Sequence, residues 1–267
     1  MNSREAGMQD LIAIANAALD ASGAVIRPYF RTGLGADDKS DESPVTAADR
    51  MAEESLRTAL AKATPDFGII GEEFPAHNTK ARFVWVIDPI DGTRAFITGR
   101  TSFTTLLGLL EDGEPVLGFI DQPITRERWG GGRGVKPLFT GGLGGKPGTR
   151  QGVKLGGAEL SATSPEMIAG AGPEAVMRFD RLKHAAKRIY WGGDAYSYGL
   201  LALGQIDLIA EHDLKPWDWA ALGPVIESAG GVVTDWSGAP LKLGCDGSVL
   251  ASANRALHDE ALEILNK

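Results

Sequence analysis

The chain of 267 residues is 43% hydrophobic and 23% charged, so it can bury a sizeable core and does not belong to the disordered class. Its formal net charge of −8 argues against a dedicated nucleic-acid binder, because such proteins present a basic face. One cysteine, Cys245, excludes an intrachain disulfide and favours a cytoplasmic protein. A membrane partner is not expected, since no apolar leader follows Met1 and no apolar stretch approaches ~20 residues.

Two amphipathic helices are predicted near the N-terminus. Apolar residues recur at helical spacing over about the first 25 residues, and Gly33 and Gly35 are expected to end this helix. A polar loop follows over residues 36–44. The second helix is expected after Thr46, because Thr46 and Asp49 resemble a capping pair at a helix start.

Four strands are predicted next, at 67–70, 83–88, 104–110 and 115–121. The last two flank Asp112-Gly113, which is a strong hairpin signal.

The region 129–152 has an unusual composition, with three runs of glycine and few apolar anchors. It is interpreted as a flexible connection between an N-terminal lobe, residues 1–150, and a C-terminal lobe, residues 151–267. A phosphate-binding glycine loop is the functional alternative, although the Lys-Ser/Thr ending of a P-loop is missing.

Strands and helices alternate in the second half of the chain. The predicted strands cover 160–164, 189–191, 206–210, 232–234 and 249–251. The predicted helices cover 173–184, 195–203, the stretch from Pro216 to Gly230, and the chain after Asn254. Such alternation is typical of layered α/β or α+β architecture, and the pattern itself does not decide between the two.

The segment Asp88-Pro89-Ile90-Asp91-Gly92-Thr93 carries the strongest chemical signal. Two carboxylates stand three residues apart, at the point where a buried strand leaves the core. Mg²⁺ takes one or two carboxylates together with substrate phosphate and water. Pro89 fixes φ between the carboxylates, and Gly92 lets the backbone approach a ligand. An Asx-type turn is the alternative, because Asp, Pro and Gly are all turn residues.

Two further segments place carboxylates at element ends. Gly71-Glu72-Glu73 closes a short apolar run, and Trp217-Asp218 opens the helix that ends at Gly230-Gly231. Each has a simpler interpretation, as solvated loop charges or as an acid that complements a helix dipole. Rigid element ends are nevertheless the positions from which the ligands of a cation cluster usually arrive.

In order and spacing, these three segments resemble the signatures of the inositol monophosphatase-like phosphatases, which are Mg²⁺-dependent and lithium-sensitive. The resemblance covers nearly the whole chain, and it implies an α+β fold, a layered αβαβα sandwich with the active site between the lobes. Within the family, three segments have amino-acid sequences most similar to the histidinol-phosphate phosphatase branch. They are residues 88–99, Lys39-Ser40-Asp41 and residues 43–50.

The resemblance also implies a set of oxygen ligands for two or three Mg²⁺ ions. The set consists of the carboxylates of Glu72, Asp88, Asp91 and Asp218 and the carbonyl oxygen of Ile90. Asp88 would bridge two ions, while Asp91 and Asp218 would hold the ion nearer the leaving group, where lithium would inhibit. The N-terminal lobe would carry most of these ligands.

Further residues are expected to act on the substrate and the water, again by resemblance. Thr93 would hold the attacking water, with Asp49 as its base, unless Asp49 only caps its own helix. Glu73 would contact the metal ligands without binding an ion itself, or it would bind a third, more weakly held ion. The backbone N–H groups of Gly92 and Thr93 would donate to a phosphate oxygen.

Asp194 and Glu211 match positions that line the leaving group in the family. The alternative for Asp194 is a helix N-cap before residues 195–203, and an exposed Glu211 would have no role. Hydrolysis of L-histidinol phosphate in histidine biosynthesis is the leading hypothesis, and an inositol monophosphatase or another small-phosphomonoester phosphatase is the close alternative. A non-catalytic homologue that binds a phosphorylated metabolite is disfavoured, because every expected ligand is present. Relatives also suggest a homodimer.

Overall fold

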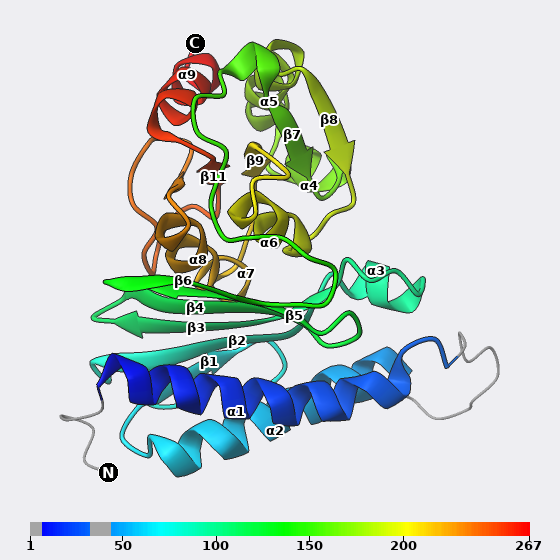
Figure 1. The fold of residues 1–267 in the computed structure, drawn as a ribbon, viewed down its shortest axis with the longest axis vertical. Coiled ribbons are helices and arrows are strands. Elements are labelled where there is room, and N and C mark those ends of the chain that lie inside the picture. Colours follow the sequence, from blue (N-terminus) through cyan, green and yellow to red (C-terminus); the bar gives the residue numbers. More distant parts are fainter. Residues whose placement is uncertain (1–6, 33–43) are drawn as a thin grey trace.

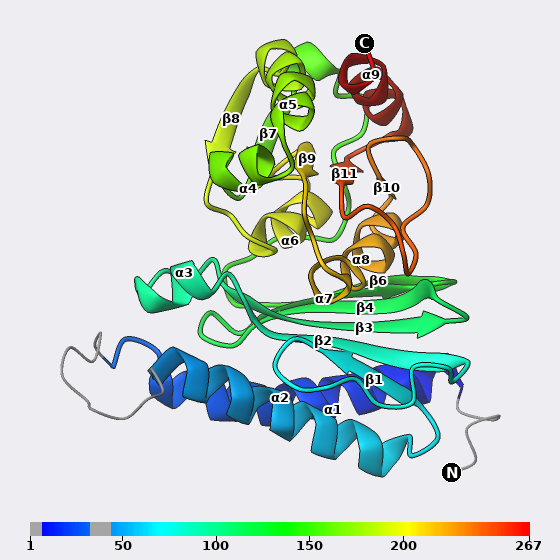
Figure 2. The same cartoon turned by 180° about the vertical axis from the view of Figure 1, so that it is seen from behind.

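Five layers of helices and strands alternate along the long axis of the molecule (Figures 1 and 2). The structure is a computed structural model that describes residues 7–32 and 44–267. Helices α1 (Met8–Ile26) and α2 (Pro44–Ala63) form the first layer, followed by a sheet, short helices, a second sheet and outer helices. The expected α+β fold with αβαβα layering is confirmed.

The first sheet has six strands in the order β1-β2-β3-β4-β5-β6. β1 and β2 run parallel, and the later neighbours run antiparallel. The hairpin predicted at Asp112-Gly113 is confirmed, because this turn joins β3 to β4. The strands are β1 (Gly68–Gly71), β2 (Phe83–Asp91), β3 (Thr104–Glu111), β4 (Glu114–Gln122), β5 (Glu127–Gly132) and β6 (Val135–Thr140).

The second sheet has five strands in the order β10-β11-β9-β7-β8. Its strands are β7 (Glu159–Ala162), β8 (Arg188–Trp191), β9 (Leu208–Glu211), β10 (Val232–Thr234) and β11 (Val249–Ser252). Between the sheets lie α6 (Tyr196–Ala202), α7 (Pro216–Trp219) and α8 (Leu222–Ser228). Beyond the second sheet lie α5 (Pro173–Ala185) and α9 (Arg255–Leu265), and α4 (Pro165–Gly170) lies at the end of β7. The single helix predicted from Pro216 is thus two short helices, and α4 was not predicted.

α1 differs from the sequence prediction in two respects. It ends at Ile26 and continues as a 3₁₀ turn, η1 (Arg27–Tyr29), before Gly33 and Gly35, which lie outside the described residues. With η1 it forms Met8–Tyr29, a stretch of mean hydropathy 1.2 that is long enough to cross a membrane, so the expectation of no such stretch is wrong. Its apolar face packs against α2 and the first sheet, as in the core helix of a soluble protein.

α2 begins three residues earlier than predicted. Pro44 is its first residue, because proline fits the first turn of a helix. Thr46 and Asp49 therefore lie inside the helix, and the predicted capping pair at its start is wrong. The loop before the helix was predicted over residues 36–44. Residues 36–43, which include Lys39-Ser40-Asp41, lie outside the described residues.

The glycine-rich region 129–152 begins as a strand pair, so the prediction of a flexible connection is wrong up to Thr140. Helix α8 packs directly on β5. A Cβ on Gly131 would lie 2.3 Å from the carbonyl oxygen of Pro224 and 2.7 Å from Oγ of Ser228. Glycine is needed here because the helix comes so close, and not because the chain must bend.

Gly131→Ala is expected to destabilise the fold by about 1–3 kcal/mol, because the added methyl group overpacks the contact with α8. Gly142→Ala is the matched control, since no heavy atom lies within 4 Å of a Cβ at that position. Urea unfolding measures both variants. Identical midpoints would contradict the argument from close packing.

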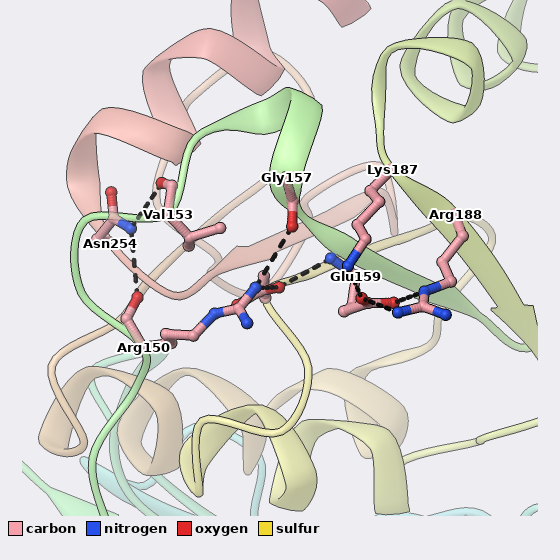
Figure 3. A network of polar contacts seen from close by, with 8 residues as sticks. Arg150, Val153, Gly157, Glu159, Lys187, Arg188 and Asn254 are labelled. Carbon is pink, nitrogen blue, oxygen red and sulfur yellow. Dashed lines mark hydrogen bonds and ion pairs between the residues drawn. The ribbon is translucent and has the colours of Figure 1, made fainter.

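The chain that crosses from the first sheet to the second is anchored by a polar network (Figure 3). The guanidinium of Arg150 pairs with the buried carboxylate of Asp207, which also accepts the N–H of Glu159 at 2.8 Å. Nδ2 of Asn254 donates to the carbonyl oxygen of Val153 at 3.1 Å. These contacts fix the end of the glycine-rich region to the second sheet, which again differs from a flexible connection.

Candidate active site

The end of β2 brings Asp88 and Asp91 to one side of the sheet. In a regular strand, side chains three residues apart point to opposite faces. The register with β3 shifts between Asp88, which faces Leu106, and Asp91, which faces Thr104. This irregularity re-aims the strand, as bulges do, and carboxylate oxygens of Asp88, Asp91 and Asp218 all lie within 4.8 Å of one another.

Asp218 reaches the cluster from α7, on the other side of the active site. Trp219 and Ala220 pack in the same buried core as Val84 of β2, which holds the short helix against the first sheet. The backbone N–H of Lys215 donates to Oδ2 of Asp218 at 2.7 Å. The simpler interpretation of Asp218, as an acid at a helix start, is therefore confirmed, and this bond helps to orient the carboxylate.

Burial and mutual repulsion raise the pKa values of these carboxylates. Burial, followed by repulsion from Asp91 and Glu72, raises the pKa of Asp88 well above its ordinary value. Burial raises the pKa of Asp218 to about 6. Oδ1 of Asp88 is buried and has no hydrogen-bond partner among the described residues. A hard divalent cation fits this donor set, because it would neutralise the carboxylates and take the free oxygen as a ligand.

Glu72 and Glu73 follow β1 directly. Because β1 and β2 are parallel neighbours, both strands end at the same edge of the sheet. Glu72 is exposed and Glu73 is half-buried. Partial burial, then repulsion from Asp218 and Glu73, raises the pKa of Glu72 to about 7. Glu72 thus lies at the rim of the cluster, outside the group of three carboxylates that meet within 4.8 Å.

The turn after β2 carries Gly92 and Thr93. Gly92 has φ 80°, a left-handed conformation that favours glycine, and a Cβ there would lie 2.8 Å from Cγ of Asp194. Thr93 begins α3 (Thr93–Ile97), and its hydroxyl donates to the carbonyl oxygen of Ile90 at 3.3 Å. The first N–H groups of a helix have no partner within it, so those at this turn can receive an anion.

Asp49 is 5% exposed and lies inside α2, so the alternative that it caps its own helix is wrong. Its Oδ1 has no hydrogen-bond partner among the described residues. Burial, then repulsion from Glu73, Glu72 and Glu53, raises the pKa of Asp49 to about 8. In the part of the chain that the structure describes, no hydrogen bond joins Asp49 to Thr93, whose hydroxyl faces Ile90 instead.

Asp194 enters the site from the second sheet's side. It has φ 45°, and the N-cap of α6 is Ala195, without a side-chain bond, so the N-cap alternative for Asp194 is wrong. Oδ2 of Asp194 accepts the hydroxyl of Ser102 at 3.1 Å. Burial raises the pKa of Asp194, although the Ser102 bond acts in the opposite direction. The N–H of Ala195 donates to Oδ2 of Asp91 at 2.7 Å and so ties this turn to the carboxylate cluster.

Glu211 ends β9 and is 4% exposed. Its Oε1 accepts the backbone N–H and the hydroxyl of Thr163, at 2.8 and 2.5 Å, and its Oε2 accepts the Tyr198 hydroxyl at 2.9 Å. Burial nevertheless raises its pKa. A cleft of about 300 Å³ runs from Asp91 and Asp218 to Asp194 and Glu211, so the structure brings two of the metal-ligating candidates and both leaving-group candidates into one space.

Sequence reasoning missed the residues that hold these acids in place. Thr163 stands directly after β7, so the element-end signal that found the carboxylates could have found it. Tyr198 and Ser102 carry no local signal, because their partners lie 13 and 92 residues away along the chain. The cleft also contains Met167 of α4, the helix that was not predicted.

Comparisons with known proteins agree with this geometry. The model of the inositol monophosphatase family matches residues 7–267. The chain is 44% identical to the chloroplastic bifunctional phosphatase IMPL2 of Arabidopsis thaliana, over 95% of this chain and 74% of the relative. It is 36% identical to the histidinol-phosphatase of Mycobacterium tuberculosis, over 96% of this chain and 98% of the relative.

The fold has close counterparts among solved structures. An inositol monophosphatase from Zymomonas mobilis superposes with a TM-score of 0.89 at 43% identity, covering 98% of this chain and 100% of that one. An inositol monophosphatase from Anabaena superposes with a TM-score of 0.83 at 27% identity, covering 97% and 96%. The chain therefore belongs to the inositol monophosphatase family and is a phosphatase of the kind that acts on small phosphomonoesters.

Proposed function

We propose that this protein is a Mg²⁺-dependent phosphomonoesterase that hydrolyses L-histidinol phosphate to L-histidinol and phosphate. The observation that carries the proposal is one cleft with Asp91 and Asp218, which meet the buried Asp88, at one end and the acids Asp194 and Glu211 at the other. Relatives at 36% and 33% identity are named histidinol-phosphatases, and these cover nearly the whole chain. The same reaction would place the protein in histidine biosynthesis.

The metal-binding end of the cleft would be built from oxygen ligands alone. Asp88, Asp91 and Asp218 would hold Mg²⁺, with Glu72 at the rim and the carbonyl oxygen of Ile90 completing the set of ligands for two or three ions. When bound, the ions supply charge neutralisation for the phosphate and a nucleophilic water at neutral pH. Asp88 is buried, which excludes solvent and strengthens these interactions.

The residues of the turn after β2 would act on the phosphate and the water. The N–H groups of Gly92 and Thr93 would donate to a phosphate oxygen. The Thr93 hydroxyl would turn from Ile90 towards the attacking water and pass its own proton to Asp49. Burial and the neighbouring acids raise the pKa of Asp49 to about 8, so Asp49 can act as this base only in its ionised form, which bound cations would favour. Glu73, half-buried beside Asp49, would support this end of the site.

The acid-lined end of the cleft would receive the leaving group. L-histidinol carries an ammonium group, whereas inositol carries only hydroxyl groups, so a carboxylate at this end favours the former. Asp194 is half-buried in the cleft wall and can accept a hydrogen bond from an amine. Glu211 already accepts three hydrogen bonds, so we expect it to contribute less.

Asp194→Asn is expected to lower kcat/KM for L-histidinol phosphate about ten- to a hundredfold. The reason is the loss of a charge-assisted hydrogen bond to the ammonium group, which contributes ~1.5–3 kcal/mol. The loss on inositol 1-phosphate should be much smaller, and this comparison cancels general damage to folding or metal binding. Glu211→Gln should show the same selectivity with a smaller loss. Equal losses on both substrates would make these acids structural and would leave inositol monophosphate as the better substrate candidate.

The same proposal extends to the organisation of the protein. We propose two lobes, residues 1–150 and 151–267, that form one compact unit, and a homodimer in solution. Cytoplasmic location is likewise proposed from the single cysteine. One relative is named as chloroplastic, so fractionation of the host cell is the direct measurement.

A further inference from the structure

Glu53 is a fully buried carboxylate that faces the loop carrying Glu72 and Glu73. Its Oε2 accepts the backbone N–H of Glu73 at 2.8 Å, and its Oε1 accepts that of Phe74 at 3.3 Å. Nε of Arg57 donates to the same Oε1 at 2.7 Å, and Nη2 of Arg57 donates to the carbonyl oxygen of Phe74 at 2.9 Å. Three donors thus hold one carboxylate that no sequence motif had marked.

The contact between Glu53 and the end of β1 is close. A Cβ on Gly71 would lie 2.1 Å from Oε1 of Glu53, so the strand end can approach the carboxylate only as glycine. Glu53 lies four residues after Asp49, which places both on the same face of α2. This face of α2 therefore directs Asp49 to the catalytic cluster and Glu53 to the loop that carries Glu72 and Glu73.

We propose that Glu53 is a positioning residue that fixes this loop so that Glu72 faces the metal cluster; the inference rests on the proposed function. Glu53 itself ligates nothing, because both of its oxygens are occupied by protein donors. Glu72 is exposed, and its side chain hydrogen-bonds with Asp88. The bonds from Glu53 to the next two N–H groups fix the backbone from which Glu72 reaches Asp88. Partners that orient metal ligands typically contribute ~10–100-fold to metal affinity.

Glu53→Gln tests the proposal with little change in side-chain size. The amide offers one acceptor oxygen, so whichever way it turns, one of the bonded N–H groups loses its acceptor. Glu54→Gln is the matched control, because Glu54 is the exposed neighbour in the same helix and loses the same charge. We expect Glu53→Gln to weaken Mg²⁺ or Mn²⁺ binding about tenfold in calorimetry. We expect Glu54→Gln to bind as the wild type does.

The outcomes separate this inference from the proposed function. Absence of divalent-ion binding in the wild type would overturn the proposed metal site itself. Wild-type binding with equal affinities in Glu53→Gln and Glu54→Gln would overturn only the positioning role. In kinetics, the half-saturating Mg²⁺ concentration should rise in Glu53→Gln, while kcat at saturating Mg²⁺ should change little.

A second variant keeps the test decisive if Glu53→Gln does not fold, as judged by circular dichroism. Arg57→Gln removes the donor on the outer side of Glu53 and the bond to Phe74, and it leaves the Glu53 carboxylate itself in place. Weaker divalent binding, by less than in Glu53→Gln, supports the positioning role. Wild-type affinity in Arg57→Gln overturns it.

Discussion

Asp91→Asn is expected to lower kcat by at least ~10²-fold, because it removes a charged ligand from the buried cluster. Asp91 is the carboxylate that the N–H of Ala195 ties to the second sheet's side of the cleft, at 2.7 Å from its Oδ2. Asparagine keeps the size and can still accept that N–H. The loss should therefore report the missing charge and not a displaced turn. Activity should also vanish when a chelator removes Mg²⁺.

A matched substitution controls for the change of charge. Asp259 lies on α9, its side chain is 62% exposed, and its ion-pair partner is Arg255, at 3.7 Å. Asp259→Asn should keep wild-type kcat, since an exposed ion pair of this kind contributes little. Calorimetry should show weaker Mg²⁺ binding in Asp91→Asn than in Asp259→Asn. Full turnover of the wild type in excess chelator would refute the proposed metal chemistry.

Thr93→Ala and Asp49→Asn are each expected to lower kcat by ~10²–10⁴-fold, because each removes part of the water-activating relay. The two groups do not share a hydrogen bond among the described residues, and the Thr93 hydroxyl faces Ile90. If both act in one relay once substrate is bound, the double variant should be little worse than the worse single variant. Losses that multiply would show that Asp49 acts independently of Thr93.

The hydroxyl can be separated from the shape of the Thr93 side chain. Thr93→Ser keeps the hydroxyl and should retain most of the activity, whereas Thr93→Val keeps the shape and should be as poor as Thr93→Ala. Calorimetry on the valine variant should show unchanged Mg²⁺ binding, because the Ile90 carbonyl is still present. Comparable activity of the serine and valine variants would remove Thr93 from the chemistry.

Local glycine and capping patterns did not predict the structure around Gly131 and Asp194. Gly131 appeared to belong to a flexible connection, but it lies in β5 beneath Pro224, a residue far along the chain. A helix N-cap was the alternative for Asp194, but Asp194 has a left-handed conformation and its carboxylate accepts the hydroxyl of Ser102. In each case a distant contact, which no local window contains, decided the structure.

The sequence by itself determined which groups could bind a cation, because carboxylates at the ends of apolar runs or at a helix start are recognisable from residue type and spacing. Asp88, Asp91 and Asp218 were found in this way, and the structure brings their oxygens within 4.8 Å. Only the tertiary structure decided how they are supported. The register shift in β2 and the buried carboxylate of Glu53 depend on neighbours that packing supplies, since hydrogen bonds and burial join segments that are remote in the chain.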